Sequence, residues 1–184
     1  NNIRFSIVRA GNVIGGGDWA KDRIVPDVMR AAEKGNSVIL RYPDSTRPWQ
    51  HVLEPLSGYL LLAEKSFMET TYNYEAFNFG PDITYNKTVL DLVNQLSLSW
   101  PNISVEVKTE EVNQKEEKLL KLVCDKANSL LQWTPVLNFE QTCEFTASWY
   151  KKYYKNKSID MEEFTLNQIQ EYSNLAKKRG LKWA

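Results

Sequence analysis

Two polar side chains stand where a phosphorylated ligand could be held. Arg47 lies in the turn-rich stretch YPDSTRPWQHV (42–52), and its guanidinium offers a planar fork of donors that suits phosphate oxygens. Asn12 follows the strand-like run IRFSIVRA (3–10), and its short amide can donate to a phosphate or a sugar hydroxyl. Both are therefore candidate ligand-binding residues. The alternatives are a solvated loop arginine and an asparagine that only holds a turn.

Three consecutive glycines, Gly15, Gly16 and Gly17, follow the same strand in RAGNVIGGGDWA (9–20). A dinucleotide-binding loop needs G-x-G-x-x-G between a strand and a helix, and a P-loop needs G-K-[ST]. Neither spacing occurs here, and Asp18 is a poor neighbour for a diphosphate. We therefore expect this run to be a flexible turn and not the main phosphate cradle.

Other side chains with possible chemistry have weaker patterns. His51, the single histidine, has a pKa suited to acid–base work, but no Ser, Cys or carboxylate partner accompanies it, so we expect a structural group. Glu54 is expected to be a helix N-terminal carboxylate and not a catalytic base. The sequence leaves both roles open. Cys124 and Cys143 form no spaced framework, so we expect free thiols and no zinc site.

The elements that must position these residues alternate between strand and helix. Periodicity predicts strands over 3–10, 37–41, 75–80 and 103–108, and helices over 22–35, 54–67, 86–100, 125–133, 138–155 and 160–180. The run 3–10 reads as a buried strand. The stretch 42–52 reads as a loop. Strands alternate with helices through residue 108 and the last third is helical, which indicates an α/β chain with part of a parallel sheet and a helical cap.

Details within these elements give further expectations. Helix 54–67 is expected to turn an inner face toward the core, made of Leu56, Tyr59, Leu60, Ala63 and Phe67. The last two helices open on capping patterns, Asn138 with Gln141 and Asp160 with Glu163. Val13 and Ile14 should line the crevice at the strand ends, and Arg9, just before it, is as well suited to packing or a salt bridge as to a ligand.

Composition limits the classes of function. The formal net charge is +0, so nothing points to nucleic acid or an anionic membrane. No apolar run approaches the roughly 20 residues needed to span a bilayer, and no signal peptide is visible. These features suggest a cytoplasmic protein. The chain opens NNIRF without an initiator Met and enters a strand almost at once, so we expect a piece of something longer.

A set of motifs, in order, resembles a known family. RAGNVIGGGDW, DRIVPD, RPWQHVLEPLSGYLLLAE and FNFGPD are similar to the C-terminal half of extended short-chain dehydrogenase/reductases that act on nucleotide-sugars. Within that superfamily the match is close to CDP-glucose 4,6-dehydratases, and it continues through LLKLVCDKA, LQWTP and ASWYK. The resemblance implies one substrate-binding unit over 1–184: the last strands of a Rossmann-type parallel sheet plus a smaller mixed α/β, largely helical substrate domain.

The resemblance also implies roles for particular residues. Arg47, in the R-x-W motif, would contact the diphosphate of a nucleotide-sugar, and Arg23 would help there or only cap a helix. Asn12, in the R-x-x-N element, would reach the substrate. Glu116 would bind ribose hydroxyls, or belong to a solvated charge run. The residues around Glu116 depart from the family pattern, because Lys115 stands where that pattern has His.

The activity implied by the resemblance is that of a lyase on CDP-glucose, in deoxysugar and surface polysaccharide (O-antigen, lipopolysaccharide) biosynthesis. Its reaction is an internal redox cycle with loss of water, in which NAD carries the hydride. The glycine fingerprint is absent from this chain. One Tyr-x-x-x-Lys spacing occurs, Tyr153 to Lys157, but it lies at the end of a late helix, so the catalytic pair is expected outside this chain and no catalytic residue is assigned. NAD would be bound mainly by an N-terminal part, and the intact protein would be a homodimer. The alternatives are a stand-alone nucleotide-sugar-binding module and a sibling epimerase.

Overall fold

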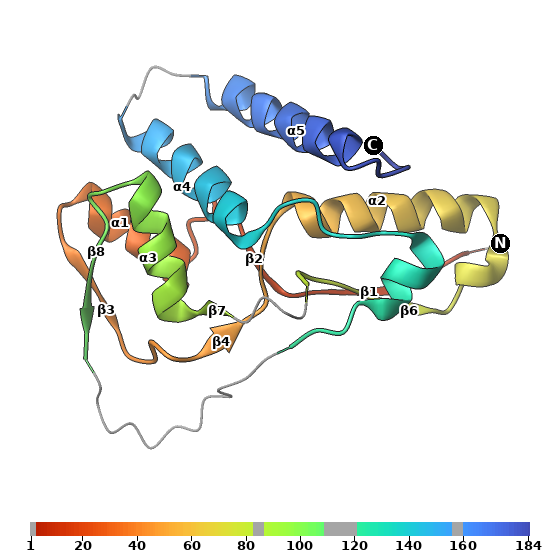
Figure 1. The fold of residues 1–184 in the computed structure, drawn as a ribbon, viewed down its shortest axis with the longest axis horizontal. Coiled ribbons are helices and arrows are strands. Elements are labelled where there is room, and N and C mark those ends of the chain that lie inside the picture. Colours follow the sequence, from red (N-terminus) through yellow and green to blue (C-terminus); the bar gives the residue numbers. More distant parts are fainter. Residues whose placement is uncertain (1–2, 83–86, 109–120, 156–159) are drawn as a thin grey trace.

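A computed structural model describes residues 3–82, 87–108, 121–155 and 160–184. Figure 1 shows two groups of elements: β1, β6 and helix α2 on one side, and α1, α3, β3 and β8 on the other, with α4 and α5 running across the top. The described strands form four pairs, β1–β6, β2–β5, β3–β8 and β4–β7. The first three pairs are parallel and the last is antiparallel. The expected α/β class with parallel strands and a helical cap is confirmed.

The strands are short. Their bounds are β1 Ile7–Ala10, β2 Asn12–Ile14, β3 Ser37–Leu40, β4 Thr46–Arg47, β5 Trp49–His51, β6 Ala76–Phe79, β7 Lys87–Thr88 and β8 Ser104–Val107. Strands β4 and β5 lie in the stretch expected to be a loop, so that prediction was wrong there. Two- and three-residue strands carry too little periodicity to be read from sequence. Their partners, β7 and β2, supply the hydrogen bonds that make them strands.

The helices match the expected segments more closely. They are α1 Ile24–Glu33, α2 Leu53–Met68, α3 Val89–Ser99, α4 Phe139–Lys155 and α5 Met161–Lys178, with a 3-10 turn at Thr70–Tyr72 and a π-helical turn at Ala127–Leu131. Asn138 and Gln141 bond reciprocally at the start of α4, and the Asp160 side chain accepts from the amides of Glu162 and Glu163. Both predicted N-termini are confirmed. None of the described helices is long and apolar enough to cross a membrane.

Helix α2 turns a different face to the core than its periodicity suggested. Leu56, Leu60 and Phe67 are exposed, whereas Leu61 and Leu62 are buried. Small residues decide the orientation, because a Cβ on Gly58 would lie 2.2 Å from the Phe79 ring of β6. The helix therefore approaches the strand through its glycine side and leaves a leucine and phenylalanine stripe uncovered. The predicted inner face was wrong except at Tyr59, which packs against the Phe79 ring.

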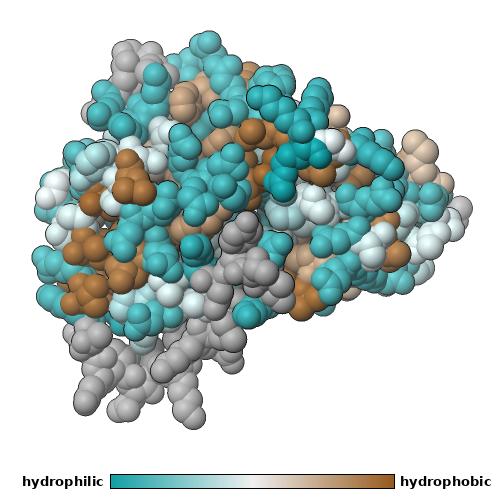
Figure 2. Space-filling model, viewed as in Figure 1, coloured by the Kyte–Doolittle hydropathy of each residue, from teal (hydrophilic) through white to brown (hydrophobic). Residues whose placement is uncertain are grey.

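Strand β1 is also less buried than expected. Ile7 and Val8 are exposed, as is Phe5 before them, so the expectation of a buried strand was wrong. Among the described strands, β1 pairs only with β6, which leaves its other edge open. A second apolar area appears at the left of Figure 2, where β3 and β8 lie and where Ile39 and Val107 are exposed.

The buried residues form separate clusters. The largest joins α1, α3 and α4 through residues such as Met29, Leu92 and Tyr150. A second lies under α2 and centres on Phe77, Phe79 and Trp133. A third joins α4, α5 and the segment before α4. The candidate site lies beside the first cluster, whose members Ile14, Val25 and Trp49 line it.

Candidate functional site

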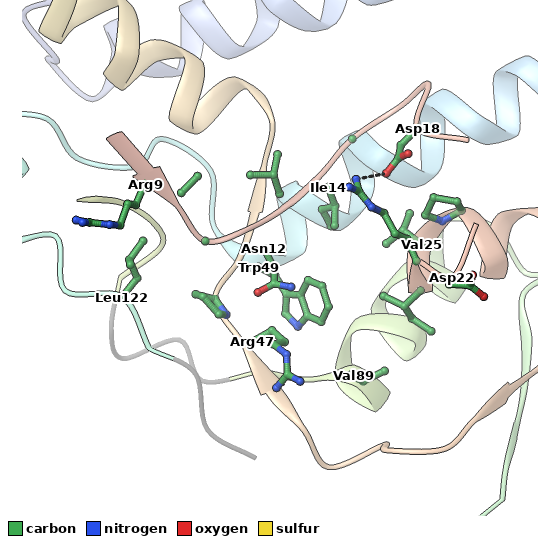
Figure 3. A pocket seen from close by; sticks show the side chains of 18 of the residues that line it. Arg9, Asn12, Ile14, Asp18, Asp22, Val25, Arg47, Trp49, Val89 and Leu122 are labelled. Carbon is green, nitrogen blue, oxygen red and sulfur yellow. Dashed lines mark hydrogen bonds and ion pairs between the residues drawn. The ribbon is translucent and has the colours of Figure 1, made fainter. Parts of the chain in front are cut away.

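A cavity of about 810 Å³ lies between the two groups of elements. Its wall is made from the end of β1, from β2, from the glycine run, from the start of α1 and from β4 (Figure 3). Asn12, Arg23 and Arg47 all line it, so three of the four predicted site residues come together. The fourth, Glu116, lies outside the described residues.

Strand pairing fixes the positions of Asn12 and Arg47. Asn12 is opposite Trp49 in the β2–β5 pair, and its backbone N–H donates to the carbonyl of Pro48 at 2.9 Å. Gly11 allows this close approach, because a Cβ there would lie 2.5 Å from the same carbonyl. Arg47 stands two residues before Trp49, on β4, and donates to the Thr46 carbonyl at 2.8 Å. Figure 3 shows Asn12, Trp49 and Arg47 gathered on one wall.

Arg23 reaches the cavity from another direction. It occupies the residue before α1, with extended backbone angles, but its side chain makes no capping hydrogen bond. The guanidinium donates instead to Asp18 Oδ2 at 3.2 Å. Arg23 therefore occupies the N-cap position of α1, but its side chain does not form the hydrogen bond by which a residue caps a helix. Arg23 is available to the cavity as a cation.

The lining carries more positive than negative charge. Arg9, Arg23, Arg47 and Lys121 are set against Asp18 and Asp22, four basic side chains against two acidic ones. The apolar part of the wall includes Ile14, Val25, Pro48, Trp49 and Val89. An open cavity of this charge suits an anion attached to a less polar group. Val13 and Ile14 line it as expected, and so does Arg9.

The glycine run serves a packing purpose. A Cβ on Gly16 would lie 2.1 Å from Trp149 of α4, and Gly17 has φ of 79°. The indole of Trp149 therefore sits directly on the run and is held by a hydrogen bond to Thr165 of α5 at 2.9 Å. The adjacent Tyr150 hydroxyl donates to the Asp18 carbonyl at 2.6 Å. The glycine run is therefore a packing surface for α4, and it also forms one end of the cavity.

His51 is buried beside the glycine run. Burial lowers the pKa of the imidazole to about 4, so the ring is neutral near pH 7. Its Nδ1 accepts from the Leu53 amide at 3.4 Å, and the ring packs edge-on against Phe145. Nε2 is buried with no hydrogen-bond partner among the described residues. A neutral imidazole enclosed in this way matches the expected structural role more closely than acid–base work.

Glu54 is buried in the first turn of α2. Its carboxylate accepts from the amides of Val136 at 3.0 Å and Leu137 at 2.6 Å and from the Tyr172 hydroxyl at 2.9 Å. Burial raises the pKa of Glu54 to about 6, and these hydrogen bonds oppose the rise. The helix N-terminal position is confirmed, but the partners belong to another segment and to α5. Glu54 joins three parts of the fold and does not line the cavity.

Several lining residues were not singled out from the sequence. Lys121 follows a charged stretch and had no motif of its own, and Asp22 stands beside the glycine run with φ of 61°. Asp18 was noted only as a poor diphosphate neighbour. The free thiols Cys124 and Cys143 are buried, and burial raises the pKa of Cys124 to about 11. Within the described part of the chain, no group of three His, Cys, Asp or Glu side chains could hold a metal ion.

We compared the chain and its structure with known proteins. No model of a known protein family matches the chain. Among solved structures, UDP-glucuronic acid 4-epimerase from Bacillus cereus, in complex with UDP-glucuronic acid and NAD, superposes with a TM-score of 0.68 at 18% identity, over 83% of this chain and 46% of that one. UDP-glucose 4-epimerase from Thermotoga maritima gives 0.69 at 19%, over 83% and 48%. dTDP-glucose 4,6-dehydratase from Bacillus anthracis gives 0.64 at 20%, over 80% and 44%.

The fold is therefore that of the C-terminal portion of Rossmann-type extended short-chain dehydrogenase/reductases. In sequence, the chain is 40% identical over 172 residues to CDP-glucose 4,6-dehydratase from Salmonella typhimurium, which covers 94% of this chain and 47% of that protein. The chain is thus a relative of the C-terminal part of that dehydratase, as the motifs indicated. It spans about half the length of the relatives it matches.

Proposed function

We propose that the chain is the substrate-binding portion of a CDP-glucose 4,6-dehydratase-like lyase, which converts CDP-glucose to CDP-4-keto-6-deoxyglucose. One observation carries the proposal: Asn12, Arg23 and Arg47 line a single cationic cavity in a chain that is 40% identical to such a dehydratase. The cavity volume, about 810 Å³, lies within the range of roughly 300–1,000 Å³ typical of small-molecule sites.

In this proposal each lining residue has a chemical task. Arg47 binds the diphosphate through its planar fork, and Arg23 adds a second positive charge. Asn12 donates its amide to a phosphate oxygen or a sugar hydroxyl. Trp49 and Val89 offer apolar surface beside these groups. Glu116 is proposed to bind ribose hydroxyls. Together these residues hold and orient the nucleotide-sugar, which is the protein's share of such a reaction.

NAD, when bound, supplies the reversible hydride transfer of the reaction. We assign none of this chain's residues to it, because the chain contains no G-x-G-x-x-G loop of the kind that holds a dinucleotide. We propose that NAD is held mainly by a preceding α/β part. The uncovered edge of β1 and the exposed stripe Leu56, Leu60 and Phe67 on α2 support such a neighbour, because parallel sheets are normally covered on both faces.

The proposal extends to the setting of the intact protein. It would be a cytoplasmic homodimer that supplies a keto-deoxysugar for surface polysaccharide (O-antigen, lipopolysaccharide) synthesis. The overall charge balance supports a small-molecule partner in place of a nucleic acid or a membrane.

The second candidate is a sibling nucleotide-sugar epimerase. Epimerases such as that from Thermotoga maritima share the fold, at 19% identity. The dehydratase is favoured because its relative matches at 40% identity over nearly the whole chain.

The base and the sugar are tested by calorimetry on the full chain with CDP-glucose, UDP-glucose and dTDP-glucose. The proposal expects CDP-glucose to bind most tightly. Equal affinities would remove the cytidine assignment, and tighter binding of UDP-glucose would favour the epimerase candidate. Binding of none of the three would contradict the proposed site.

A further inference from the structure

The cavity contains an ion pair between two of its own lining residues. Arg23 Nη1 donates to Asp18 Oδ2 at 3.2 Å, and both side chains face the cavity. Figure 3 shows this pair, with Asp18 opposite the end of the cavity where Arg9 lies. A carboxylate in a cavity for anions repels its ligand, so its presence there needs a reason.

Asp18 is held firmly in place. The Tyr150 hydroxyl of α4 donates to its carbonyl at 2.6 Å, and the Ala20 amide donates to its Oδ1 at 3.0 Å. The glycine run before it is fixed by Trp149. Arg30 donates to the carbonyls of Trp19 and Ala20 just beyond it. Asp18 therefore remains where it is when a ligand enters.

Arg23 is the movable partner. Its side chain is 65% exposed, whereas that of Asp18 is 32% exposed. In the part of the chain that the structure describes, its guanidinium bonds to Asp18 through a single hydrogen bond. Exposed pairs of this kind contribute little free energy, and a phosphate with several acceptor oxygens is a stronger partner for a guanidinium. An anion of sufficient charge can therefore take Arg23 from Asp18.

We propose that Asp18 restrains Arg23 in this cavity and thereby lowers the affinity of the cavity for a diphosphate. It neutralises Arg23 while the cavity is empty, so that a ligand with a second phosphate group must break the Asp18–Arg23 pair to capture Arg23. A ligand with one phosphate stays at Arg47 and gains nothing from Arg23. The inference rests on the proposed function only in that the cavity takes a diphosphate.

The test uses inorganic pyrophosphate and inorganic phosphate as probes, in calorimetry at low salt, where exposed charges are least screened. Asp18→Asn keeps an Oδ1 acceptor for the Ala20 amide and removes the charge. Asp22→Asn is the matched control, because Asp22 lines the same cavity without pairing with Arg23. Asp18→Asn should tighten pyrophosphate binding about two- to fivefold, more than Asp22→Asn does, and change phosphate binding less.

A double variant shows whether the tighter pyrophosphate binding of Asp18→Asn depends on Arg23. In an Arg23→Ala background, Asp18→Asn should lose most of its effect on pyrophosphate. An equal gain from Asp18→Asn and Asp22→Asn, an undiminished gain in the Arg23→Ala background, or no pyrophosphate binding by any variant would overturn the inference.

Thermal unfolding checks that Asp18→Asn still folds. If it does not, Arg23→Ala alone decides, because it should weaken pyrophosphate more than phosphate, and equal weakening would overturn the inference. Failure of the proposed function is seen separately. A chain that shows the Asp18→Asn effect but does not prefer CDP-glucose keeps this inference and loses the dehydratase assignment.

Discussion

Two groups of polar side chains in this fold behave in opposite ways. The first is the cavity wall with Asn12, Arg47 and Arg23, whose side chains line an open cavity. The second is the buried network of Glu54, which accepts from two amides and the Tyr172 hydroxyl. The buried carboxylate has the perturbed pKa that often marks an active site, yet it is not among the residues that line the candidate cavity. In this protein, exposure to the cavity distinguishes a binding residue from a structural one, and the pKa shift does not.

The largest expected effect comes from breaking the buried network. Glu54→Ala leaves the Val136 and Leu137 amides and the Tyr172 hydroxyl without their acceptor. We expect a loss of about 3 kcal/mol in the free energy of unfolding, measured by urea denaturation. Glu64→Ala, an exposed position on the same helix, is the control and should change little. If the two variants were equally stable, Glu54 would not join these segments.

A second prediction concerns pH. The pKa of His51 is lowered to about 4 in the fold, so the unfolded chain binds its proton more readily. The contribution of His51 to the free energy of unfolding is complete above pH 6.5, the pKa of the imidazole in the unfolded chain. This contribution is lost as the pH falls toward 4. Linkage makes this loss roughly 3 kcal/mol. Unfolding measured across this range should show it, and His51→Gln should remove it.

Glu54 acts in the opposite direction over part of the same range. Its pKa rises from 4.5 to about 6, so its contribution is present below 4.5 and is lost as the pH rises through 6. Because the two effects oppose each other, the His51→Gln variant should become more stable on acidification from pH 6 to 4.5. A variant that still lost stability through that interval would contradict the burial of these two groups.

Much of this arrangement could be predicted from the sequence. The helix boundaries followed from capping residues such as Asn138 and Asp160, whose bonds are local. The candidates Asn12, Arg23 and Arg47 came from motif resemblance, and they meet in one cavity. Local signals and family motifs were sufficient for both.

What could not be predicted depends on distant partners. Trp149 packs on Gly16 and so joins the first and the last thirds of the chain. Because this contact is not local, the sequence predicts only a flexible turn for the glycine run. Helix α2 carries two possible inner faces, and contact with Phe79 selects the one that holds Gly58. Lys121 reaches the cavity only through the tertiary fold. Periodicity contains none of this information.

The central claim is that the cavity wall, and not the buried network, binds the diphosphate. It is tested most directly by titrating CDP into the full chain and into its Arg47→Ala variant, with Arg41→Ala as the control because Arg41 does not line the cavity. Arg47→Ala should weaken binding by about 1.5–3 kcal/mol, the usual contribution of a hydrogen bond to a charged group. Arg41→Ala should leave it unchanged. Equal affinities for the wild-type chain and Arg47→Ala would contradict the account.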